Sequence, residues 1–410
     1  MSWAPWLAAL FAGGGVAAEL ALRRANPWRL WCHAFDEASA MEPHPTRGWM
    51  QRPGHRFRFH HRYLRRPVDI RFNRLGLHDA TEYTTDKGAD VYRVALMGCT
   101  TAVGWEVPVD QTLAARLRDT LQGRLPGRRV EVMNAAVRLY GTGQLFDFYD
   151  QEIAAYRPDL VLYYLNLNHP RRTITAHESG KSPVLSQPVW GLDGNGALTR
   201  LAVEPATHTN DMVFLDEDGT IRRKPGRTER SVHRWLLDRS HLYTCLDDFR
   251  QGPVRLRHWR DRVEIKDLEV RSLRDGVLGH MADLPYQWRI VARLLDRWNA
   301  AVQAGGGRLV VAPHLTYYNV RGGALFKPVP QHPWGFTFDT IPERRYAGFL
   351  ARHLGFAFLD TYAHARESLR DDVEHYYVHP RYTYMTAAGA DFIAGVLGDQ
   401  LAAAGILPTD

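Results

Sequence analysis

VYRVALMG, at residues 91–98, is a short apolar run that ends in glycine, as buried parallel strands often do. The helical pattern QTLAARLRDTLQGRL follows at 111–125, and a second apolar run, RVEVMNA, lies at 129–135. A second helical pattern, GQLFDFYDQEIAAY at 143–156, precedes a third apolar run, DLVLYYLNLN at 159–168. This alternation predicts right-handed crossovers and a parallel sheet covered by helices on both faces.

The alternation resumes towards the carboxyl terminus. A long helical pattern, QWRIVARLLDRWNAAVQA at 287–304, precedes the apolar run RLVVAP at 308–313. A helix near 344–354 precedes the run GFAFLD at 355–360, and a last helix is expected from about Thr386 to Ala404. These segments predict two further strands and their covering helices.

The predicted elements divide most of the chain into three parts. Residues 91–169 and 284–404 should form one three-layer α/β/α sandwich around a mostly parallel sheet of about five strands. Residues 170–283 lose the alternation and contain turn-rich stretches, which predicts a large insertion between strands of the sheet. Residues 25–90 are rich in Pro, His and Arg and predict a strand-and-loop lead-in, with its best strand candidate at His55–Phe72.

The amino terminus carries an apolar segment. Trp3–Leu22 reads WAPWLAALFAGGGVAAELAL, with Glu19 as its one charge. Twenty helical residues rise about 30 Å, the thickness of the hydrocarbon core of a bilayer, so we expect residues 1–24 to be an uncleaved membrane anchor. A buried or interfacial helix is the alternative. Arg23 and Arg24 follow the segment, and the positive-inside rule alone would place the rest of the chain in the cytoplasm.

Composition and charge exclude several classes of protein. The 410 residues are 45% hydrophobic and 24% charged, which excludes wholesale disorder. Three scattered cysteines are too few for a disulfide framework, and the histidines lack metal-ligand spacing, so we expect no metal and no cofactor. A net charge of +7 is modest for this length and no nucleic-acid-binding module is visible, so we expect no nucleic-acid partner.

The ligand crevice of an open parallel sheet lies at the carboxyl ends of its strands. Four segments of this chain end there, at residues 98–100, 134–141, 166–169 and 379–389. The blocks VALMGCTTAVGWEVPVDQTLAARL, NAAVRLYGTGQ, DLVLYYLNLN and TAAGADFIAGVL resemble the SGNH/GDSL hydrolase family, and in particular its membrane-anchored bacterial members related to polysaccharide O-acetylation proteins. Outside the insertion, the resemblance covers nearly the whole chain. It implies an activated hydroxyl, an oxyanion hole and a His oriented by an Asp, in a domain outside the cytoplasm.

The resemblance places Thr100 where the family has its nucleophile. The family's Gly-Asp-Ser turn is replaced by Gly98-Cys99-Thr100, at the start of a predicted helix. A threonine hydroxyl can attack a carbonyl when a base adjoins it, but its extra methyl group crowds the approach. Cys99 stands at the Asp position, and we expect it to be a small core residue rather than a reactive thiol.

The oxyanion hole is altered in one of its two blocks. The family has a glycine five residues after the position of Asn134, and this chain has Leu139 there. Gly141 and Gly143 lie close by and could shift into the role. Asn168 matches the family's oxyanion Asn, and the following His169, in place of an acid, is either a surface histidine or a new polar contact.

The base and its orienting acid are replaced by tyrosines. Aligning on the Ala-Ala-Gly of residues 387–389 puts Tyr384 at the family's His position and Tyr382 at its Asp position. A tyrosine has a reference pKa near 10 and is a poor general base at neutral pH. His379 with Asp371 or Asp372 could supply the pair if residues 380–383 bulge.

These replacements together predict a pseudo-enzyme, because losing one member of such a triad already costs on the order of 10⁴ in rate. We expect a membrane-anchored, catalytically degenerate SGNH-like protein that binds a partner protein or an envelope glycan on the extracytoplasmic side. The alternative is an esterase or O-acyltransferase acting on an acylated glycan through Thr100, Asn168 and His379. In either case Thr100, Asn134, Asn168 and Tyr384 should line one crevice.

The insertion bears aromatic residues that suit a binding interface, although such residues more often belong to the core. They are Trp190, Trp235, Tyr243 and Trp259.

Overall fold

The structure is a computed structural model. It describes residues 4–25, 40–59, 64, 66–166, 168–177, 185–207, 212–216, 219–224, 236, 240, 242–243, 246, 278–315, 342–368, 373–379 and 382–408.

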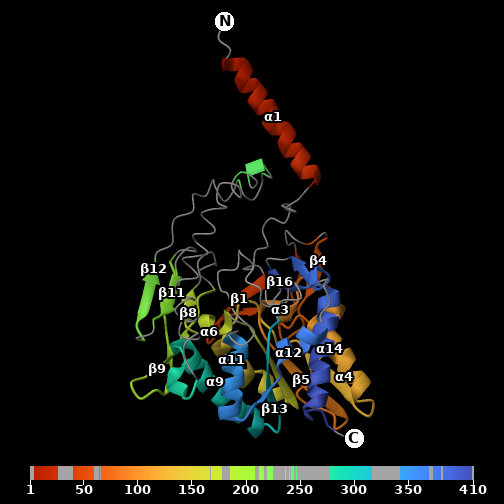
Figure 1. Cartoon of the computed structure of the whole chain (residues 1–410), viewed down its shortest axis with the longest axis vertical. Helices are drawn as coiled ribbons and strands as arrows, with labels where there is room; N and C mark the ends of the chain where they lie inside the picture. Colours follow the sequence, from red (N-terminus) through yellow and green to blue (C-terminus); the bar gives the residue numbers. More distant parts are fainter. Residues whose placement is uncertain are drawn as a thin grey trace.

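A five-stranded parallel sheet forms the centre of the molecule (Figure 1). Its strands lie in the order β14-β13-β7-β5-β6, and each neighbouring pair runs parallel. Val94 pairs with Leu160 and Met97 with Tyr163, which confirms that the first and third apolar runs are neighbours in one sheet. The strands are β5 (Val91–Met97), β6 (Arg129–Met133), β7 (Leu160–Leu165), β13 (Arg308–Pro313) and β14 (Ala357–Phe358).

Two groups of helices cover the sheet. On one face of the sheet, α4 packs against α14, and α14 also contacts α12. On the other face, α5 packs against α9, and α9 also contacts α11. Right-handed crossovers place the two groups on opposite faces, because the chain moves one way from β5 to β6 and the other way from β6 to β7. The helices are α4 (Leu113–Arg124), α5 (Thr142–Gln151), α9 (Tyr286–Ala304), α11 (Pro342–Leu354), α12 (Thr361–Ser368) and α14 (Ala387–Ala403). The predicted α/β class with a parallel five-stranded sheet is confirmed.

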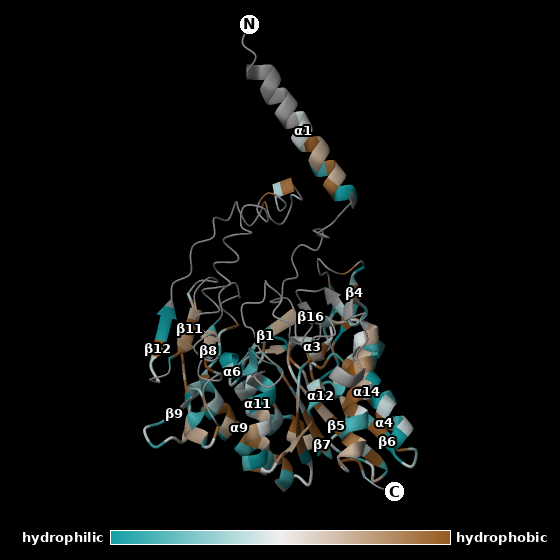
Figure 2. Ribbon diagram, viewed as in Figure 1, coloured by the Kyte–Doolittle hydropathy of each residue, from teal (hydrophilic) through white to brown (hydrophobic). Residues whose placement is uncertain are grey.

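Burial on both faces explains why the sequences of the central strands are mostly apolar. Every residue of β5 and β7 is buried, and apolar residues gather on the sheet and on the inner sides of its helices (Figure 2). Short elements at the strand ends complete this part of the chain. They are α3 (Thr100–Val103), η1 (Val109–Gln111), η2 (Ile153–Tyr156), α6 (Asn168–Thr173), η4 (Met281–Asp283), α13 (Val373–Tyr376), β15 (Tyr377–His379) and β16 (Tyr382–Met385).

The lead-in is built of two antiparallel hairpins. They pair β1 (Met41–His44) with β2 (Gly48–Gln51) and β3 (Arg56–Phe59) with β4 (Val68–Arg71). The single strand expected at His55–Phe72 is therefore wrong. The two ends of this segment pair with each other instead. This pairing brings the rings of residues 57, 59 and 72 into contact with buried Trp105, at distances of 5.2 to 5.7 Å between each ring centroid and that of Trp105, and burial of these rings stabilises the hairpin.

The described part of the insertion consists of small antiparallel sheets. The three-stranded one has the order β12-β11-β8, and the other is a β9-β10 hairpin. Trp190 in β9 is buried, and its ring lies edge-on to that of Phe146 with centroids 6.3 Å apart, so it belongs to the core. Trp235 and Trp259 lie outside the described residues. The strands are β8 (Thr175–His177), β9 (Val189–Leu192), β10 (Leu198–Leu201), β11 (Met212–Leu215) and β12 (Ile221–Lys224).

Helix α1 (Ala4–Ala25) occupies the apolar segment at the amino terminus and extends away from the sheet (Figure 1). Among the residues that the structure describes, no helix combines the length and the apolarity needed to cross a membrane. The membrane span expected at Trp3–Leu22 is therefore not supported. Residues 13–15 are glycines, which add no apolar side chain, and the carboxylate of Glu19 accepts hydrogen bonds from Ser240 Oγ (2.9 Å) and Leu242 N (2.8 Å).

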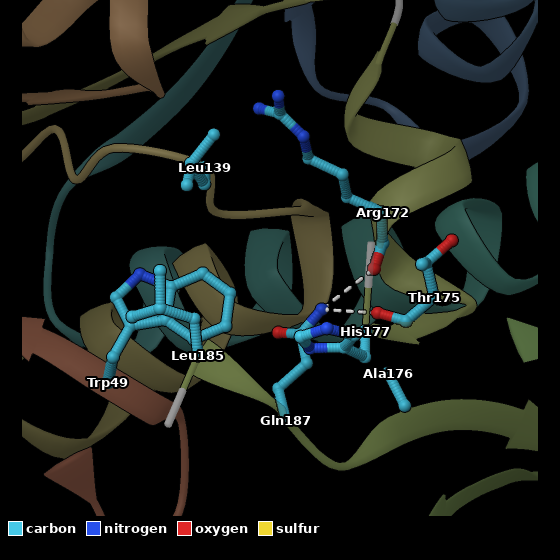
Figure 3. Close-up of a pocket in the computed structure, with 8 residues that line it drawn as sticks. All are labelled: Trp49, Leu139, Arg172, Thr175, Ala176, His177, Leu185 and Gln187. Atoms are coloured by element: carbon cyan, nitrogen blue, oxygen red, sulfur yellow. Dashed lines mark hydrogen bonds between the residues drawn. The ribbon is translucent and has the colours of Figure 1, made fainter. Parts of the chain in front are cut away.

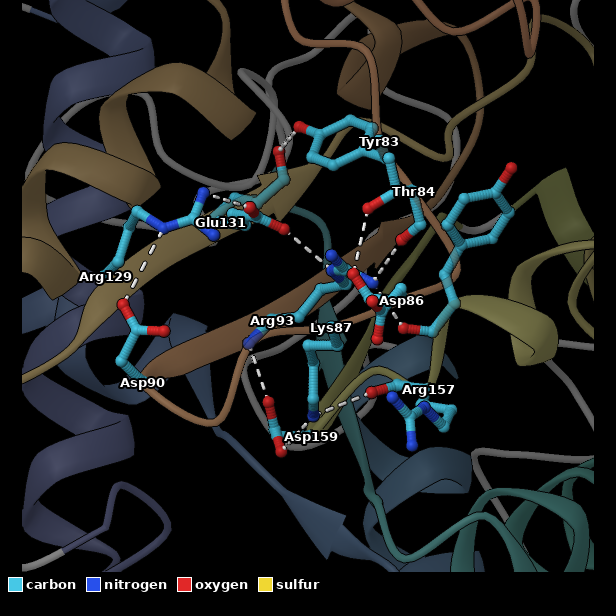
Figure 4. Close-up of polar contacts among 12 residues, drawn as sticks. Tyr83, Thr84, Asp86, Lys87, Asp90, Arg93, Arg129, Glu131, Arg157 and Asp159 are labelled. Carbon is cyan, nitrogen blue, oxygen red and sulfur yellow. Dashed lines mark hydrogen bonds and ion pairs between the residues drawn. The ribbon is translucent and has the colours of Figure 1, made fainter.

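A buried arginine ties the amino-terminal ends of the strands together (Figure 4). Arg93 in β5 has 2% of its side chain exposed, and its Nε donates to Glu131 Oε2 in β6 at 2.8 Å. Its Nη1 donates to the carbonyl oxygens of Thr84 (2.9 Å) and Tyr156 (2.7 Å). One guanidinium thus joins the lead-in, two strands of the sheet and the segment before β7.

Replacing Arg93 with alanine should lower the free energy of unfolding by about 3–5 kcal/mol, because it leaves Glu131 Oε2 and two main-chain carbonyls without the donor they share. Equilibrium unfolding in urea measures this loss. Arg129→Ala is the matched control, since Arg129 pairs with the same Glu131 at 2.7 Å but has 60% of its side chain exposed. The control should lose less than about 1 kcal/mol, and equal losses would contradict the role given to Arg93.

Candidate functional site

Thr100 lies at the first turn after β5, at the carboxyl edge of the sheet. Gly98 makes this turn possible, because a Cβ atom there would lie 2.6 Å from the Cβ of Ala102. Thr100 is the first residue of α3 and is 7% exposed. Asn168 begins α6 directly after β7, the strand next to β5, so the two predicted site residues follow neighbouring strands at one edge.

The hydroxyl of Thr100 accepts a hydrogen bond from the main chain. The N–H of Leu139 donates to Thr100 Oγ1 at 3.3 Å, and Leu139 has a φ of 68°. This left-handed conformation costs a residue other than glycine roughly 1–2 kcal/mol. A main-chain N–H is supplied by every residue except proline, so the leucine at this position does not by itself remove a donor, and the role of this N–H in an oxyanion hole stays a prediction.

The two nearby glycines do not take over this role. The N–H of Gly141 donates to Gln144 Oε1 at 3.1 Å, and that of Gly143 donates to Thr173 Oγ1 at 3.4 Å. Gly143 instead serves packing, since a Cβ atom there would lie 2.2 Å from Cδ1 of Trp190.

Asn134 is a positioning residue beneath α3. It is fully buried, and its Nδ2 donates to the carbonyl oxygens of His78 (3.0 Å) and Val103 (3.2 Å). Its own N–H donates to Asp79 Oδ2 at 3.2 Å. Asn134 therefore holds the lead-in against the end of α3 instead of facing an open crevice.

Two residues of the lead-in that we did not predict support the same turn. His78 is buried, and its Nδ1 lies 2.9 Å from the carbonyl oxygen of Val103; burial lowers the pKa of His78 to about 4, so the ring is neutral. Asp79 accepts hydrogen bonds from the hydroxyl of Tyr83 (2.7 Å) and the N–H of Thr81 (2.9 Å), and burial raises the pKa of its carboxyl. Both residues lie in the segment RFNRLGLHD, at residues 71–79 of the lead-in.

The segment after β7 forms a buried polar cluster. Asn166 Oδ1 accepts from the N–H of Asn168 (2.9 Å), while its Nδ2 lies 3.1 Å from Nδ1 of His314 at the end of β13. His169 is fully buried and stacked on Tyr163, whose hydroxyl lies 2.8 Å from its Nδ1. Of the two alternatives for His169, the new polar contact is confirmed and the surface histidine is wrong. Burial holds the pKa of His169 well below its usual value, so this ring is also neutral.

Cys99 is a core thiol. It is 3% exposed, and burial raises its pKa, although the positive charge of Arg172 opposes this rise. A buried thiol of raised pKa is a weak nucleophile at neutral pH. This agrees with the expected core role.

The carboxyl-terminal block lies against α3. Strand β16, which carries Tyr384, contacts α3, and Tyr384 is half-buried. β16 pairs antiparallel with β15, and in this register His379 stands opposite Tyr382. The side chains of His379 and Tyr382, together with residues 371–372 and 380–381, lie outside the described part of the structure, so a pair formed by His379 and an aspartate stays a prediction.

A pocket adjoins Leu139 (Figure 3). Apolar walls come from Trp49, Leu139 and Leu185, and polar ones from Arg172, His177 and Gln187. Gln187 Nε2 donates to the carbonyl oxygens of Arg172 (2.9 Å) and Thr175 (2.8 Å), which fixes the 185–187 segment against α6 and β8.

Comparison with known proteins gives structural neighbours only. No family model matches the chain, and no curated protein does. An acetylxylan esterase from Geobacillus stearothermophilus is 10% identical, with a TM-score of 0.37 over 76% of this chain and 94% of that one. A putative GDSL-like lipase from Parabacteroides merdae is 10% identical, with a TM-score of 0.36 over 77% of this chain and 96% of that one.

A third neighbour is an alpha/beta hydrolase enzyme from the metagenome of Lake Arreo, Spain, 12% identical, with a TM-score of 0.36 over 78% of this chain and 97% of that one. The three neighbours are thus described as an acetylxylan esterase, a putative GDSL-like lipase and an alpha/beta hydrolase. The sequence blocks resemble the same family. TM-scores below 0.5 carry no inference about the activity of this chain, which must be argued from its own residues.

Leu139→Gly tests the strained backbone at the site. The variant should lose less than about 1.5 kcal/mol of unfolding free energy, because relief of the left-handed conformation offsets most of the lost leucine burial. The measurement is equilibrium unfolding in urea. Leu145→Gly, at a fully buried position inside α5, is the control and should lose more than about 3 kcal/mol. Comparable losses would show that Leu139 bears no strain.

Proposed function

We propose that this chain is a catalytically degenerate SGNH-like protein, which binds an acylated glycan at the carboxyl edge of its sheet without hydrolysing the ester. The observation that carries the proposal is the hydrogen bond from the N–H of Leu139 to Thr100 Oγ1 at 3.3 Å. It shows a main-chain donor beside the hydroxyl at which we propose that the acyl group binds, and by the family resemblance Tyr384 stands in the place of the base.

The state of the nearby histidines supports the loss of catalysis. Ester hydrolysis through a hydroxyl needs a base within hydrogen-bonding reach of that hydroxyl. His78, His169 and His314 are fully buried, and the Nδ1 of each already faces a main-chain carbonyl, a phenol or an amide. The polar groups at this edge of the sheet are therefore better suited to binding a ligand and to holding the local structure than to transferring a proton.

The second candidate is an esterase or O-acyltransferase that uses Thr100, Asn168 and His379. The same hydrogen bond favours it, because a hydroxyl beside a main-chain donor is also the arrangement of a nucleophile in front of an oxyanion hole. This candidate requires His379 to reach Thr100, and the binding role does not.

The wider setting of the proposal rests on the family resemblance. On the basis of this resemblance, the proposed partner of this chain is an envelope glycan or a protein of an envelope assembly, and the proposed place of the domain is the extracytoplasmic side. A spanning helix is no part of the proposal.

A hydrolysis assay separates the two candidates. The purified full chain should release p-nitrophenol from p-nitrophenyl acetate at the background rate, and Thr100→Ala should be indistinguishable from it. Turnover that exceeds background and disappears in Thr100→Ala would overturn the binding role and establish the esterase. A GDSL-type esterase with its intact triad serves as the positive control for the substrate.

A binding measurement tests the positive half of the proposal. By isothermal titration calorimetry, an O-acetylated xylo-oligosaccharide should bind at least about fivefold more tightly than its deacetylated form, because one hydrogen bond to the carbonyl contributes about 1 kcal/mol. Thr100→Val keeps the shape and removes the hydroxyl that now accepts from the N–H of Leu139, so the preference should persist or increase in this variant. Equal affinity for the two forms would contradict recognition of an acyl group.

A further inference from the structure

A strained turn carries the main-chain donor of the proposed acyl site. The N–H of Tyr140 donates to the carbonyl oxygen of Val137 at 3.4 Å, which closes a turn around Arg138 and Leu139. Of these two central residues, Leu139 alone has a positive φ, 68°, which is the pattern of a type II turn. Glycine or asparagine is favoured at this place, so a leucine stays there only if its surroundings hold it.

The peptide unit between Arg138 and Leu139 makes two hydrogen bonds in opposite directions. The carbonyl oxygen of Arg138 accepts from Nε1 of Trp49 at 3.1 Å, and the N–H of Leu139 donates to Thr100 Oγ1 at 3.3 Å. A trans peptide unit is planar, so its C=O and N–H point to opposite sides of the chain. The bond that holds the carbonyl towards Trp49 therefore also directs the N–H towards Thr100.

Rotation of this peptide unit would give the turn a second state. In a type I turn the central peptide unit points the other way, and the third residue has a φ of about −90°, which most residues adopt at little cost. Leu139 would lose its left-handed strain in that state, but the bonds to Trp49 and Thr100 would both break. The hydrogen bond from Trp49 thus favours the strained state, in which the donor faces Thr100.

Trp49 is itself firmly held in β2. It is 4% exposed, its ring lies edge-on to that of Tyr140 with centroids 5.6 Å apart, and its carbonyl oxygen accepts from the hydroxyl of Tyr140. Two residues further along β2, Gln51 Nε2 donates to the carbonyl oxygens of Gly76 (2.7 Å) and Ala136 (3.4 Å). These contacts fix the indole N–H relative to the turn.

From this arrangement we infer that Trp49 is a positioning residue of the proposed acyl site, because its indole N–H fixes the peptide unit that presents the Leu139 N–H at Thr100. The inference rests on the proposed function for the nature of the ligand. It adds that the lead-in controls the direction of the donor. Trp49 acts through the main chain of residues 138–139 and needs no contact with the ligand.

A crystal structure of Trp49→Phe tests the geometry. Phenylalanine keeps an aromatic ring and lacks the indole N–H, so the peptide unit should rotate and the φ of Leu139 should become negative. The distance from Leu139 N to Thr100 Oγ1 should then exceed about 3.5 Å, the limit of a hydrogen bond. A positive φ at Leu139 in this variant, with its N–H still bonded to Thr100, would overturn the inference.

Trp298→Phe is the matched control for this substitution. Trp298 in α9 is fully buried, and its Nε1 has no hydrogen-bond partner among the described residues. The control therefore removes the same atoms from the core without removing a hydrogen bond. It should leave the φ of Leu139 positive, and a rotated peptide unit in Trp298→Phe would overturn the role given to the indole N–H of Trp49.

Isothermal titration calorimetry measures the consequence for the ligand. The preference for the O-acetylated over the deacetylated xylo-oligosaccharide should fall from at least about fivefold in the wild type to less than about twofold in Trp49→Phe, because the donor no longer faces the acyl carbonyl. Trp298→Phe should keep the wild-type preference. Equal preferences in Trp49→Phe and the wild type would contradict the inference.

A double variant separates the orientation of the peptide unit from simple packing. Trp49→Phe combined with Leu139→Gly should recover part of the preference, since glycine adopts a positive φ without steric cost. A packing role alone predicts a further loss, because the double variant removes a second buried side chain. A double variant with no more preference than Trp49→Phe would overturn the positioning role.

Tyr140→Phe provides the test if Trp49→Phe does not fold. It removes the hydroxyl that donates to the carbonyl oxygen of Trp49 and leaves the indole N–H in place. Trp49 is then less firmly held, so the preference should fall in the same direction but to a smaller extent. A preference equal to that of the wild type would overturn the inference.

The two measurements also distinguish this inference from the proposed function. A wild type without any preference for the acetylated sugar would remove the acyl ligand, and the φ of Leu139 in the crystal structure of Trp49→Phe would still decide whether Trp49 orients the peptide unit. A wild-type preference that persists in Trp49→Phe would leave the acyl ligand standing and remove the positioning role.

Discussion

The amide of Asn134 donates to two buried carbonyl oxygens, of His78 and of Val103, and the carboxyl edge of the sheet depends on this pair of hydrogen bonds. They join the lead-in, the end of β6 and the short helix that carries Thr100. A helix of four residues has too few internal hydrogen bonds to be stable by itself. The position of this helix is set by the two hydrogen bonds from Asn134 and by the turn at Gly98.

The site illustrates how the path of the backbone can position a hydrogen-bond donor without a particular side chain. The donor at Thr100 is a main-chain N–H, so its place depends on the path of the chain and hardly on residue type. Leu139 follows that path at the cost of a left-handed conformation, which the surrounding packing maintains. A reacting side chain has no such protection, because one substitution removes the reacting group.

The pocket beside the site exists because three parts of the chain meet there. Trp49 comes from the lead-in, Leu139 from the segment after β6, and Arg172 and His177 from the start of the insertion. Burial of Trp190 against Phe146 secures the insertion to the same core. The lead-in and the insertion therefore both contribute walls to this pocket.

The sequence by itself determined the α/β class and the parallel sheet, because strands buried on both faces need uninterrupted apolar runs and each crossover needs an amphipathic helix. It also located Thr100 and Asn168 at the ends of β5 and β7, since parallel strands end at one edge. Only the tertiary structure showed the left-handed Leu139, the hairpin between residues 55 and 72, and the burial of Asn134 and His169. These features depend on contacts between segments distant in the sequence, such as Asn134 with His78 and Asn166 with His314, and a one-dimensional pattern of polarity contains no information about which distant groups will meet.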